Sequence, residues 1–201
     1  MRRGESIINI VQIDGLKIIK PLGSGYFSTV YLGEYQDTLV AIKAISSDDL
    51  SFGNETKVLQ SIQGSPHASY IINDIPGSEE YPIIITKYEE GAPLSNIYTQ
   101  LNIHDIKFIL KDLLLCLQAV HSRQVVHQDI TLYNILYSPE LHQATLIDWG
   151  CGSFVVENRM SPFNGSRLYR SPEMLIGYQN YSTKADMWAV GVVILLMITR
   201  G

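Results

Sequence analysis

The sequence has little of what marks extracellular or membrane-bound proteins. Only two cysteines, Cys116 and Cys151, occur in 201 residues, which is too few for a disulfide framework. The longest apolar run, residues 189–198, is about half as long as a helix that spans a bilayer. The basic start, MRR, is not followed by an apolar segment, so it does not fit a signal peptide. These absences predict an intracellular protein, in the cytoplasm, the nucleus or both, with no membrane partner.

Positive charge is also scarce. The chain has 15 lysines and arginines against 20 aspartates and glutamates, and its net charge at pH 7 is −5. This balance gives no electrostatic basis for binding nucleic acid. Apolar side chains, in contrast, are abundant: 46% of the residues are hydrophobic and 17% are charged. Such a composition is typical of a folded protein with a core and argues against disorder.

The first part of the chain has the pattern of a β-sheet. Apolar stretches within residues 7–45 are broken by a glycine-rich segment and a polar turn, which predicts several strands. An apolar stripe predicts a short helix over 51–63, with Ser51 as its candidate N-cap. Further strands are predicted at 70–72 and 83–88.

The second part has the pattern of helices. Segment 89–96 interrupts the apolar pattern and is predicted to be a linker. Apolar residues then recur at helical spacing over 104–122, and Cys116 falls among them as a core residue. Short strands are predicted at 134–137 and 144–148, before a long polar stretch.

A last, buried helix is predicted from about Thr183. Thr183 and Asp186 fit a capping box, and an apolar run follows them. The order is therefore β-rich first and helix-rich second, with a hinge near residue 89. This order predicts an α+β, two-lobed architecture, and clefts between lobes are common ligand sites.

Two motifs in the β-rich part are candidates for phosphate binding. In LGSGYFSTV, 22–30, two glycines between strands let backbone N–H groups approach a phosphate, although a glycine-rich hairpin turn explains the same string. It is not a Walker A loop, because no G-K-[ST] follows. In VAIK, 40–43, Lys43 ends an apolar strand. It is either exposed through its long stem or faces a cleft, where Glu55 could be its partner.

Two motifs in the helix-rich part carry carboxylates and an amide. In HQDITLYN, 127–134, Asp129 can accept a hydroxyl proton and Asn134 offers an oxygen suited to a hard metal ion. An Asx-rich turn is the alternative. In LIDWG, 146–150, Asp148 can bind Mg²⁺, and the alternative is an Asp-x-Gly turn that ends a strand.

The order and spacing of these four motifs resemble the signature set of eukaryotic protein kinases. The finer resemblance is to the CMGC group, and most closely to the catalytic subunit of casein kinase II. Four stretches carry it: DWG in place of D-F-G, KVLQSIQGSP (57–66), SRLYRSPE (166–173) and YQNYSTKADMWAVG (178–191). The resemblance covers residues 16–201. It implies an N-lobe over 1–88 and a partial C-lobe over 89–201, truncated after the central buried helix relative to the family.

The resemblance also implies the role of each motif residue, with ATP and Mg²⁺ as cofactors. Asp129 would be the catalytic base, Lys43 and Glu55 the ion pair that orients the phosphates, and Asn134 and Asp148 the Mg²⁺ ligands. The nucleotide would lie among residues of the glycine loop, the strand that carries Lys43, the hinge and the floor of the cleft: Leu22, Gly23, Ser24, Gly25, Tyr26, Phe27, Ser28, Thr29, Val30, Ala41, Lys87, Tyr88, Glu89 and Leu136.

Three further positions receive roles from the same resemblance. Thr86 would be the gatekeeper before the hinge, and Asp186 would brace the backbone of the catalytic loop besides capping its helix. Ser166 would line the peptide site beside Asp129.

The catalytic loop departs from the family at two positions. Gln128 replaces an arginine that usually contacts a phosphate on the activation segment, and a neutral amide cannot form two charged bonds to phosphate. We therefore expect that phosphorylation of Ser161 or Ser166 does not switch this protein. Thr131 replaces a lysine beside the transferring phosphoryl group, and Tyr133 stands where tyrosine kinases supply an arginine instead. Slow catalysis is the expected consequence.

Two other departures concern substrates and partners. SSDDLSFGNE replaces the lysine-rich cluster of casein kinase II, which weakens the expectation of acidic substrates. In the family, further helices follow the central helix, and one of their arginines pairs with the glutamate at the position of Glu173. This sequence has no counterpart of those helices. The sequence is then either a fragment or a chain whose exposed C-lobe face is covered by a regulatory subunit or another partner.

Two functions follow from the sequence. The first is an ATP-dependent serine/threonine protein kinase that transfers the γ-phosphate to a protein Ser or Thr hydroxyl. The alternative is a pseudokinase, a nucleotide-binding or scaffolding domain with weak or no transfer. Lys43, Glu55, Asp129, Asn134 and Asp148 favour the first, and Thr131 favours the second. A small-molecule kinase is disfavoured because SRLYRSPE resembles a peptide-binding segment.

Overall fold

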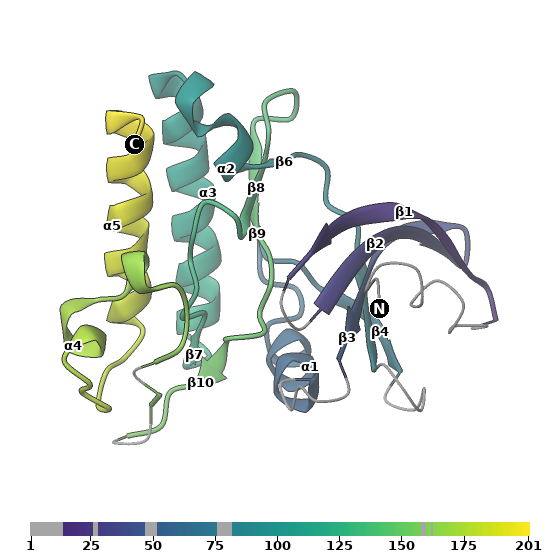
Figure 1. Ribbon diagram of the computed structural model, residues 1–201, viewed down its shortest axis with the longest axis horizontal. Coiled ribbons are helices and arrows are strands. Elements are labelled where there is room, and N and C mark those ends of the chain that lie inside the picture. The colour runs from purple at the N-terminus through teal and green to yellow at the C-terminus, as the bar shows by residue number, and fades with distance from the viewer. Residues whose placement is uncertain (1–13, 26–27, 47–51, 76–81, 158–159, 162) are drawn as a thin grey trace, which may run out of the picture.

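The computed structural model (Figure 1) describes residues 14–25, 28–46, 52–75, 82–157, 160–161 and 163–201. Its first part is a five-stranded antiparallel sheet with strand order β1-β2-β3-β5-β4. The strands are β1 (Leu16–Ser24), β2 (Ser28–Tyr35), β3 (Thr38–Ile45), β4 (Ile71–Ile75) and β5 (Ile83–Lys87). Helix α1 (Phe52–Ser61) packs against β4 on one side and β10 (Ser153–Phe154) on the other.

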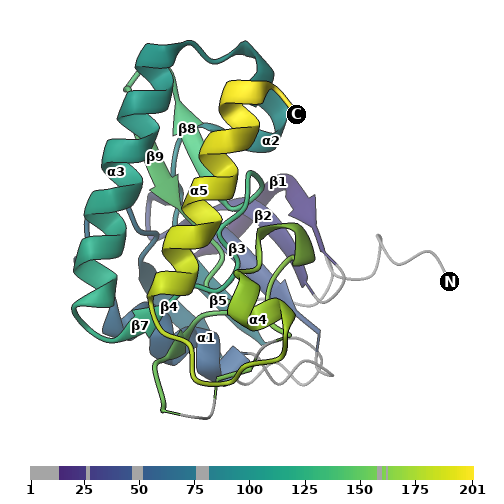
Figure 2. The ribbon, with the colours of Figure 1, turned by 90° about the vertical axis from the view of Figure 1, so that its left-hand side faces the viewer.

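The second part is mainly helical. Its long helices, α3 (Ile103–His121) and α5 (Lys184–Thr199), lie side by side (Figure 2). The short strands are β6 (Ala92–Pro93), β7 (Val125–Val126), β8 (Ile135–Ser138) and β9 (Gln143–Leu146), and the short helices are α2 (Leu94–Ile97), α4 (Pro172–Leu175) and two 3₁₀ turns, Tyr98–Gln100 and Arg167–Tyr169. The predicted α+β architecture, β-rich first and helical second, is confirmed.

The core explains why these segments fold as they do. The predicted stripe of α3 is buried at Ile109, Leu113 and Leu117, and Cys116 is fully buried beside it, as predicted. Trp149 is also fully buried and meets the ring of His127 edge-on, at 4.5 Å between centroids. The large core cluster thus runs from α1 through the catalytic-loop region to α5.

Some element boundaries differ from the predictions. The strand predicted at 70–72 begins one residue later and extends to Ile75, and the predicted linker 89–96 contains β6 and most of α2. The β prediction for 7–13 and the N-cap prediction for Ser51 lie outside the described residues. The boundary between lobes at residue 89 stays a prediction, although the chain leaves the sheet at Lys87.

The capping box predicted at the start of α5 is wrong. Thr183 has helical backbone angles and forms no side-chain cap hydrogen bond, because the carboxylate of Asp186 binds another segment instead. A capping box does form at the start of α3, where Asn102 Oδ1 accepts from the Asp105 amide at 3.1 Å and Asp105 Oδ2 accepts from the Asn102 amide at 3.1 Å.

Helix α5 is buried along one face only, which corrects the prediction of a buried helix. Ala189, Val193 and Met197 are buried, while Trp188 is 48% exposed and Leu195 is 60% exposed. The reason is that no element among the described residues packs against this outer face. The described residues also contain no helix that is long and apolar enough to cross a membrane.

Candidate active site

A cavity of about 490 Å³ lies between the sheet and the helical part. Most of the residues predicted to hold the nucleotide line it. They come from the glycine loop, β3, the segment after β5 and β8: Leu22, Gly23, Ser24, Gly25, Ser28, Val30, Ala41, Lys43, Lys87, Tyr88, Glu89 and Leu136. Thr29 lies in β2, opposite Ser24, but not among the lining residues, and Tyr26 and Phe27 lie outside the described residues.

The hinge segment follows β5 directly. The amide of Tyr88 donates to the carbonyl of Leu39 at 3.2 Å, which ties the start of this segment to β3. Lys87 Nζ lies 3.7 Å from Glu89 Oε2. Burial raises the pKa of Glu89 above its ordinary value, although Lys87 opposes this shift. The amide of Lys87 also donates to the carbonyl of Tyr70 at 3.2 Å, so the backbone beside the cavity is attached to two other segments.

Sequence reasoning missed several lining residues. Ile84 and Leu59 form apolar wall, and Ile147, just before Asp148, lies with them. Others lie at the mouth or floor of the cavity, namely Ser69, Gly91, Pro93, Tyr133 and Trp149. Position relative to a motif could have identified Ile147 and Trp149. Tyr133 also lies within the HQDITLYN motif, next to Asn134. Ser69 is remote from every motif, so only the fold brings it to the cavity.

Lys43 forms an ion pair with two carboxylates. Its Nζ lies 2.7 Å from Glu55 Oε1 and 2.7 Å from Asp148 Oδ1. Glu55 is buried in the first turn of α1, with 2% of its surface exposed. Although burial opposes its charge, the two carboxylates raise the pKa of Lys43 above its ordinary value. Burial likewise favours the neutral form of Asp148, but Lys43 outweighs it and lowers the pKa of this carboxyl group. Lys43 and Asp148 are therefore both charged at neutral pH.

Two backbone features make room for this cluster. Asp148 adopts a left-handed conformation with φ of 60°, which turns its carboxylate toward the cavity that Lys43 also lines. A Cβ at Gly150 would lie 3.2 Å from Glu55 Oε2 and 3.3 Å from Lys43 Nζ. Glycine at this position therefore leaves space for the ion pair.

Replacing Lys43 by methionine should lower the affinity for Mg²⁺-ATP by about 10- to 100-fold, because charged hydrogen bonds to the phosphates are lost. The variant should also unfold at a lower temperature, since the carboxylate of Glu55 stays buried without this ammonium group. Calorimetric titration and thermal unfolding measure the two effects. Adding Glu55→Gln should recover stability but not affinity. Unchanged nucleotide affinity in Lys43→Met would show that Lys43 does not contact the nucleotide.

The catalytic loop orients Asp129 from two sides. Asn134 Nδ2 donates to Asp129 Oδ2 at 3.0 Å and to the Asp129 carbonyl at 2.9 Å. The amide of Ser166 donates to Asp129 Oδ1 at 2.8 Å. Asp129 does not line the nucleotide cavity, whereas Asn134 does. The loop thus places a carboxylate just outside the cavity, between it and the activation segment.

Thr131 is folded back into the loop. It is 1% exposed, and its Oγ1 accepts from the amides of Tyr133 at 3.2 Å and Asn134 at 3.3 Å. These bonds hold the turn that carries Asn134. The position where the family has a cation therefore carries a neutral hydroxyl that supports the backbone.

Asp186 holds the other end of the loop. This residue of α5 is 1% exposed, and its two oxygens accept from the amides of His127 and Gln128, both at 2.9 Å. Oδ2 also lies 2.8 Å from Nε2 of His121, at the end of α3. One carboxylate thus connects α3, α5 and the catalytic loop, the bracing role expected for Asp186.

The donor set suits a magnesium ion carried by a nucleotide. Asn134 uses its amide nitrogen on Asp129, which leaves its amide oxygen as the ligand atom, and Asp148 adds a charged oxygen in the same cavity. Hard oxygen ligands, few in number, are what Mg²⁺ takes when phosphates complete its shell. Among the described residues, no group of three or more His, Cys, Asp or Glu is placed to hold a metal ion, and the magnesium ligands stay a prediction.

Residues 16–201 match the family model for the protein kinase domain. Since the match covers most of the chain, this protein belongs to the protein kinase family. Its class is therefore that of the phosphotransferases that act on proteins, a family that generally uses ATP and Mg²⁺.

Proposed function

We propose that the chain is an ATP-dependent serine/threonine protein kinase. The observation that carries the proposal is that Lys43, Asn134 and Asp148 line one cavity, while Asp129 is oriented at its edge. These are the groups that phosphoryl transfer needs: a cation for the phosphates, metal ligands, and a base for the incoming hydroxyl.

Each residue has a defined task in the reaction. Lys43 exchanges its bond to Asp148 for bonds to the nucleotide phosphates and keeps Glu55 as its partner. Mg²⁺ held by Asn134 and Asp148 would supply positive charge against the charge that develops on the phosphates. Asp129 accepts the proton of the substrate hydroxyl. At the same time the hydroxyl oxygen bonds to the γ-phosphorus, and the bond between the γ-phosphorus and the bridging oxygen of ADP breaks.

Serine or threonine is the proposed acceptor because the activation segment lies close to the base. The Ser166 amide contacts Asp129 directly, so a peptide bound along this segment would pass near the carboxylate. A short side chain fits this arrangement better than the longer tyrosine.

We also propose that the chain belongs to the CMGC group and is most similar to the catalytic subunit of casein kinase II. The stretch SRLYRSPE (166–173) supports this assignment. The intracellular location remains a prediction.

Turnover of Mg²⁺-ATP on a peptide library with Ser, Thr or Tyr acceptors tests the proposal, with ATP binding measured in parallel. Transfer to Ser or Thr peptides supports the kinase. Binding without transfer would establish the alternative, a pseudokinase, which the absence of a cation at Thr131 favours. Transfer to Tyr peptides alone would overturn the assignment of the acceptor.

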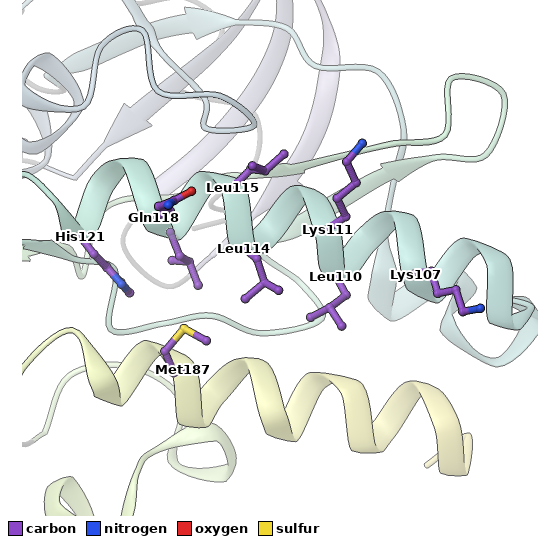
Figure 3. Close-up of a pocket in the computed structure, with 9 residues that line it drawn as sticks. Lys107, Leu110, Lys111, Leu114, Leu115, Gln118, His121 and Met187 are labelled. Atoms are coloured by element: carbon purple, nitrogen blue, oxygen red, sulfur yellow. The ribbon is translucent and has the colours of Figure 1, made fainter.

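A protein partner on the exposed face of the C-lobe is also proposed. An apolar groove of about 680 Å³ lies between α3 and α5, away from the catalytic residues, with Leu110, Leu114 and Met187 in its wall (Figure 3). Lys107 and Lys111 lie along the same helix (Figure 3). The apolar side chains of Leu110, Leu114 and Met187 form the floor of the groove, and Lys107 and Lys111 form a basic rim. Such a groove is complementary to an amphipathic helix with acidic flanks.

The groove proposal predicts that acidic amphipathic peptides bind this face. Replacing Lys107 and Lys111 together by glutamate should weaken binding about tenfold or more and reduce its salt dependence, because opposite charges would become like charges. Fluorescence titration of labelled peptides measures the affinity. A basic peptide of the same apolar pattern is the control. Equal affinity for both peptides in the parent protein would contradict the proposed complementarity.

A further inference from the structure

Gln128 contacts the activation segment through both ends of its amide. Its Nε2 donates to Ser153 Oγ in β10. Its Oε1 accepts from Asn164 Nδ2 at 3.0 Å and from the hydroxyl of Tyr181 at 2.6 Å. One neutral side chain therefore contacts Ser153 and Asn164 in the activation segment, and Tyr181 in the connection between α4 and α5.

The surroundings of Gln128 fit these bonds. Gln128 and Tyr181 are both buried, and the Tyr181 hydroxyl also contacts the carbonyl of Ser161. Burial, and after it the nearby Asp186, raises the pKa of Tyr181 to about 12, so the hydroxyl stays protonated and able to donate. Buried hydrogen bonds of this kind are costly to leave unmade.

The backbone makes a second attachment at the same place. A Cβ on Gly165 would lie 2.0 Å from the carbonyl oxygen of Gln128, so only glycine allows these two backbone segments to approach each other this closely. Gly165 also has φ of 71°, a conformation that favours glycine. The next residue, Ser166, then reaches Asp129 with its amide. The residues that contact Gln128 therefore directly precede the residue that contacts Asp129: Asn164 and Gly165 lie against Gln128, and Ser166 bonds to Asp129.

We propose that Gln128 is a positioning residue that holds the activation segment against Asp129 by neutral hydrogen bonds, without a phosphate. The inference rests on the proposed kinase function and adds the means by which its peptide site is kept in place. An arginine here would only donate, so it could not accept from Asn164 Nδ2 as Gln128 Oε1 does. The Asn164 amide would have to turn its oxygen toward the guanidinium, and the Tyr181 hydroxyl would have to accept from it while donating to the Ser161 carbonyl. The arginine that is usual in the family would therefore change the contacts that this segment makes.

Gln128→Arg is the central test. It should lower kcat/KM for the peptide by roughly tenfold or more, mainly through KM, while the KM for ATP stays unchanged. Hydrogen exchange of the amides of Gly165 and Ser166 should accelerate by a similar factor. Gln60→Arg, which adds the same charge on the exposed face of α1, is the matched control and should change neither quantity.

Two further variants separate positioning from general stability. In Gln128→Arg with Asn164→Asp, a carboxylate accepts from the guanidinium, so both peptide KM and exchange should move back toward the parent values. Tyr181→Phe removes one hydroxyl with little change in volume and should raise peptide KM by a smaller factor. Phosphatase treatment of the parent protein should leave its kcat/KM unchanged.

The outcomes distinguish this inference from the proposed function. Exchange is measured without substrate, so it reports on the segment even in a protein that transfers no phosphate. Faster exchange in Gln128→Arg with no turnover in the parent would overturn the kinase and keep the role of Gln128. Turnover in the parent with unchanged exchange and peptide KM in Gln128→Arg would overturn the role of Gln128. A tenfold loss of activity on dephosphorylation would also overturn it.

Discussion

Asp129→Asn is expected to lower kcat by about 10²- to 10⁴-fold, which is the usual contribution of a positioned general base. The asparagine has nearly the same shape and can keep an oxygen toward the Ser166 amide, which costs the side-chain bond from Asn134 Nδ2. Asn134 Nδ2 keeps its bond to the carbonyl of residue 129, so the loop should stay folded. Because Asp129 does not line the nucleotide cavity, ATP affinity should be unchanged. Single-turnover transfer to a Ser peptide and calorimetric ATP binding measure the two quantities.

The matched control for this variant is Asp112→Asn, a buried aspartate of α3 that does not line the cavity and whose carboxylate accepts from the Ala144 amide in β9. It should affect thermal stability more than transfer. Transfer at the parent rate in Asp129→Asn would exclude Asp129 as the base, and the kinase assignment would then depend on another carboxylate.

Thr131→Lys is expected to raise kcat by up to about 10²- to 10³-fold, the amount that one preorganised donor at a transition state contributes. The new ammonium group would extend from the loop toward the edge of the cavity where Asn134 lies. The same change removes the two bonds that Thr131 Oγ1 accepts, so thermal stability should fall by about 1–2 kcal/mol. Steady-state kinetics and thermal unfolding measure these opposite effects.

Thr131→Met separates charge from support of the loop. Methionine has a similar stem but no charge, so it should lose the same stability and show no gain in rate. If the lysine and methionine variants were equally slow, the hydroxyl of Thr131 would matter for the geometry of Asn134, and the missing cation would not limit the rate.

The sequence was sufficient to predict the motif residues of the site. Asn134 and Asp148 lie in short loops next to β8 and β9, whereas Lys43 lies inside β3, which continues to Ile45 and does not end at Lys43 as predicted. The α+β order also followed from local apolar periodicity, which depends on neighbours three or four residues away. These parts of the structure are determined by local sequence.

What the sequence could not predict depends on distant partners. Asp186 fits a local capping box by spacing, and only the family resemblance predicted that its carboxylate braces the backbone of the catalytic loop; its contact with His121 was not predicted. Gln128 looked like the loss of an arginine, and its bonds to Asn164 and Tyr181 became visible only in the fold.

The carboxylate of Asp186 also bears on how the protein acquires its activity during folding. It joins His127 and His121 across 59 and 65 residues of sequence, so its contacts form only after α3 and α5 have docked. Contacts of such long range are slow to form, because closing the long loop costs conformational entropy before the favourable free energy of the contact is gained. The catalytic loop thus gains its shape late, and a partly folded chain can hold its sheet and helices while being inert toward substrate.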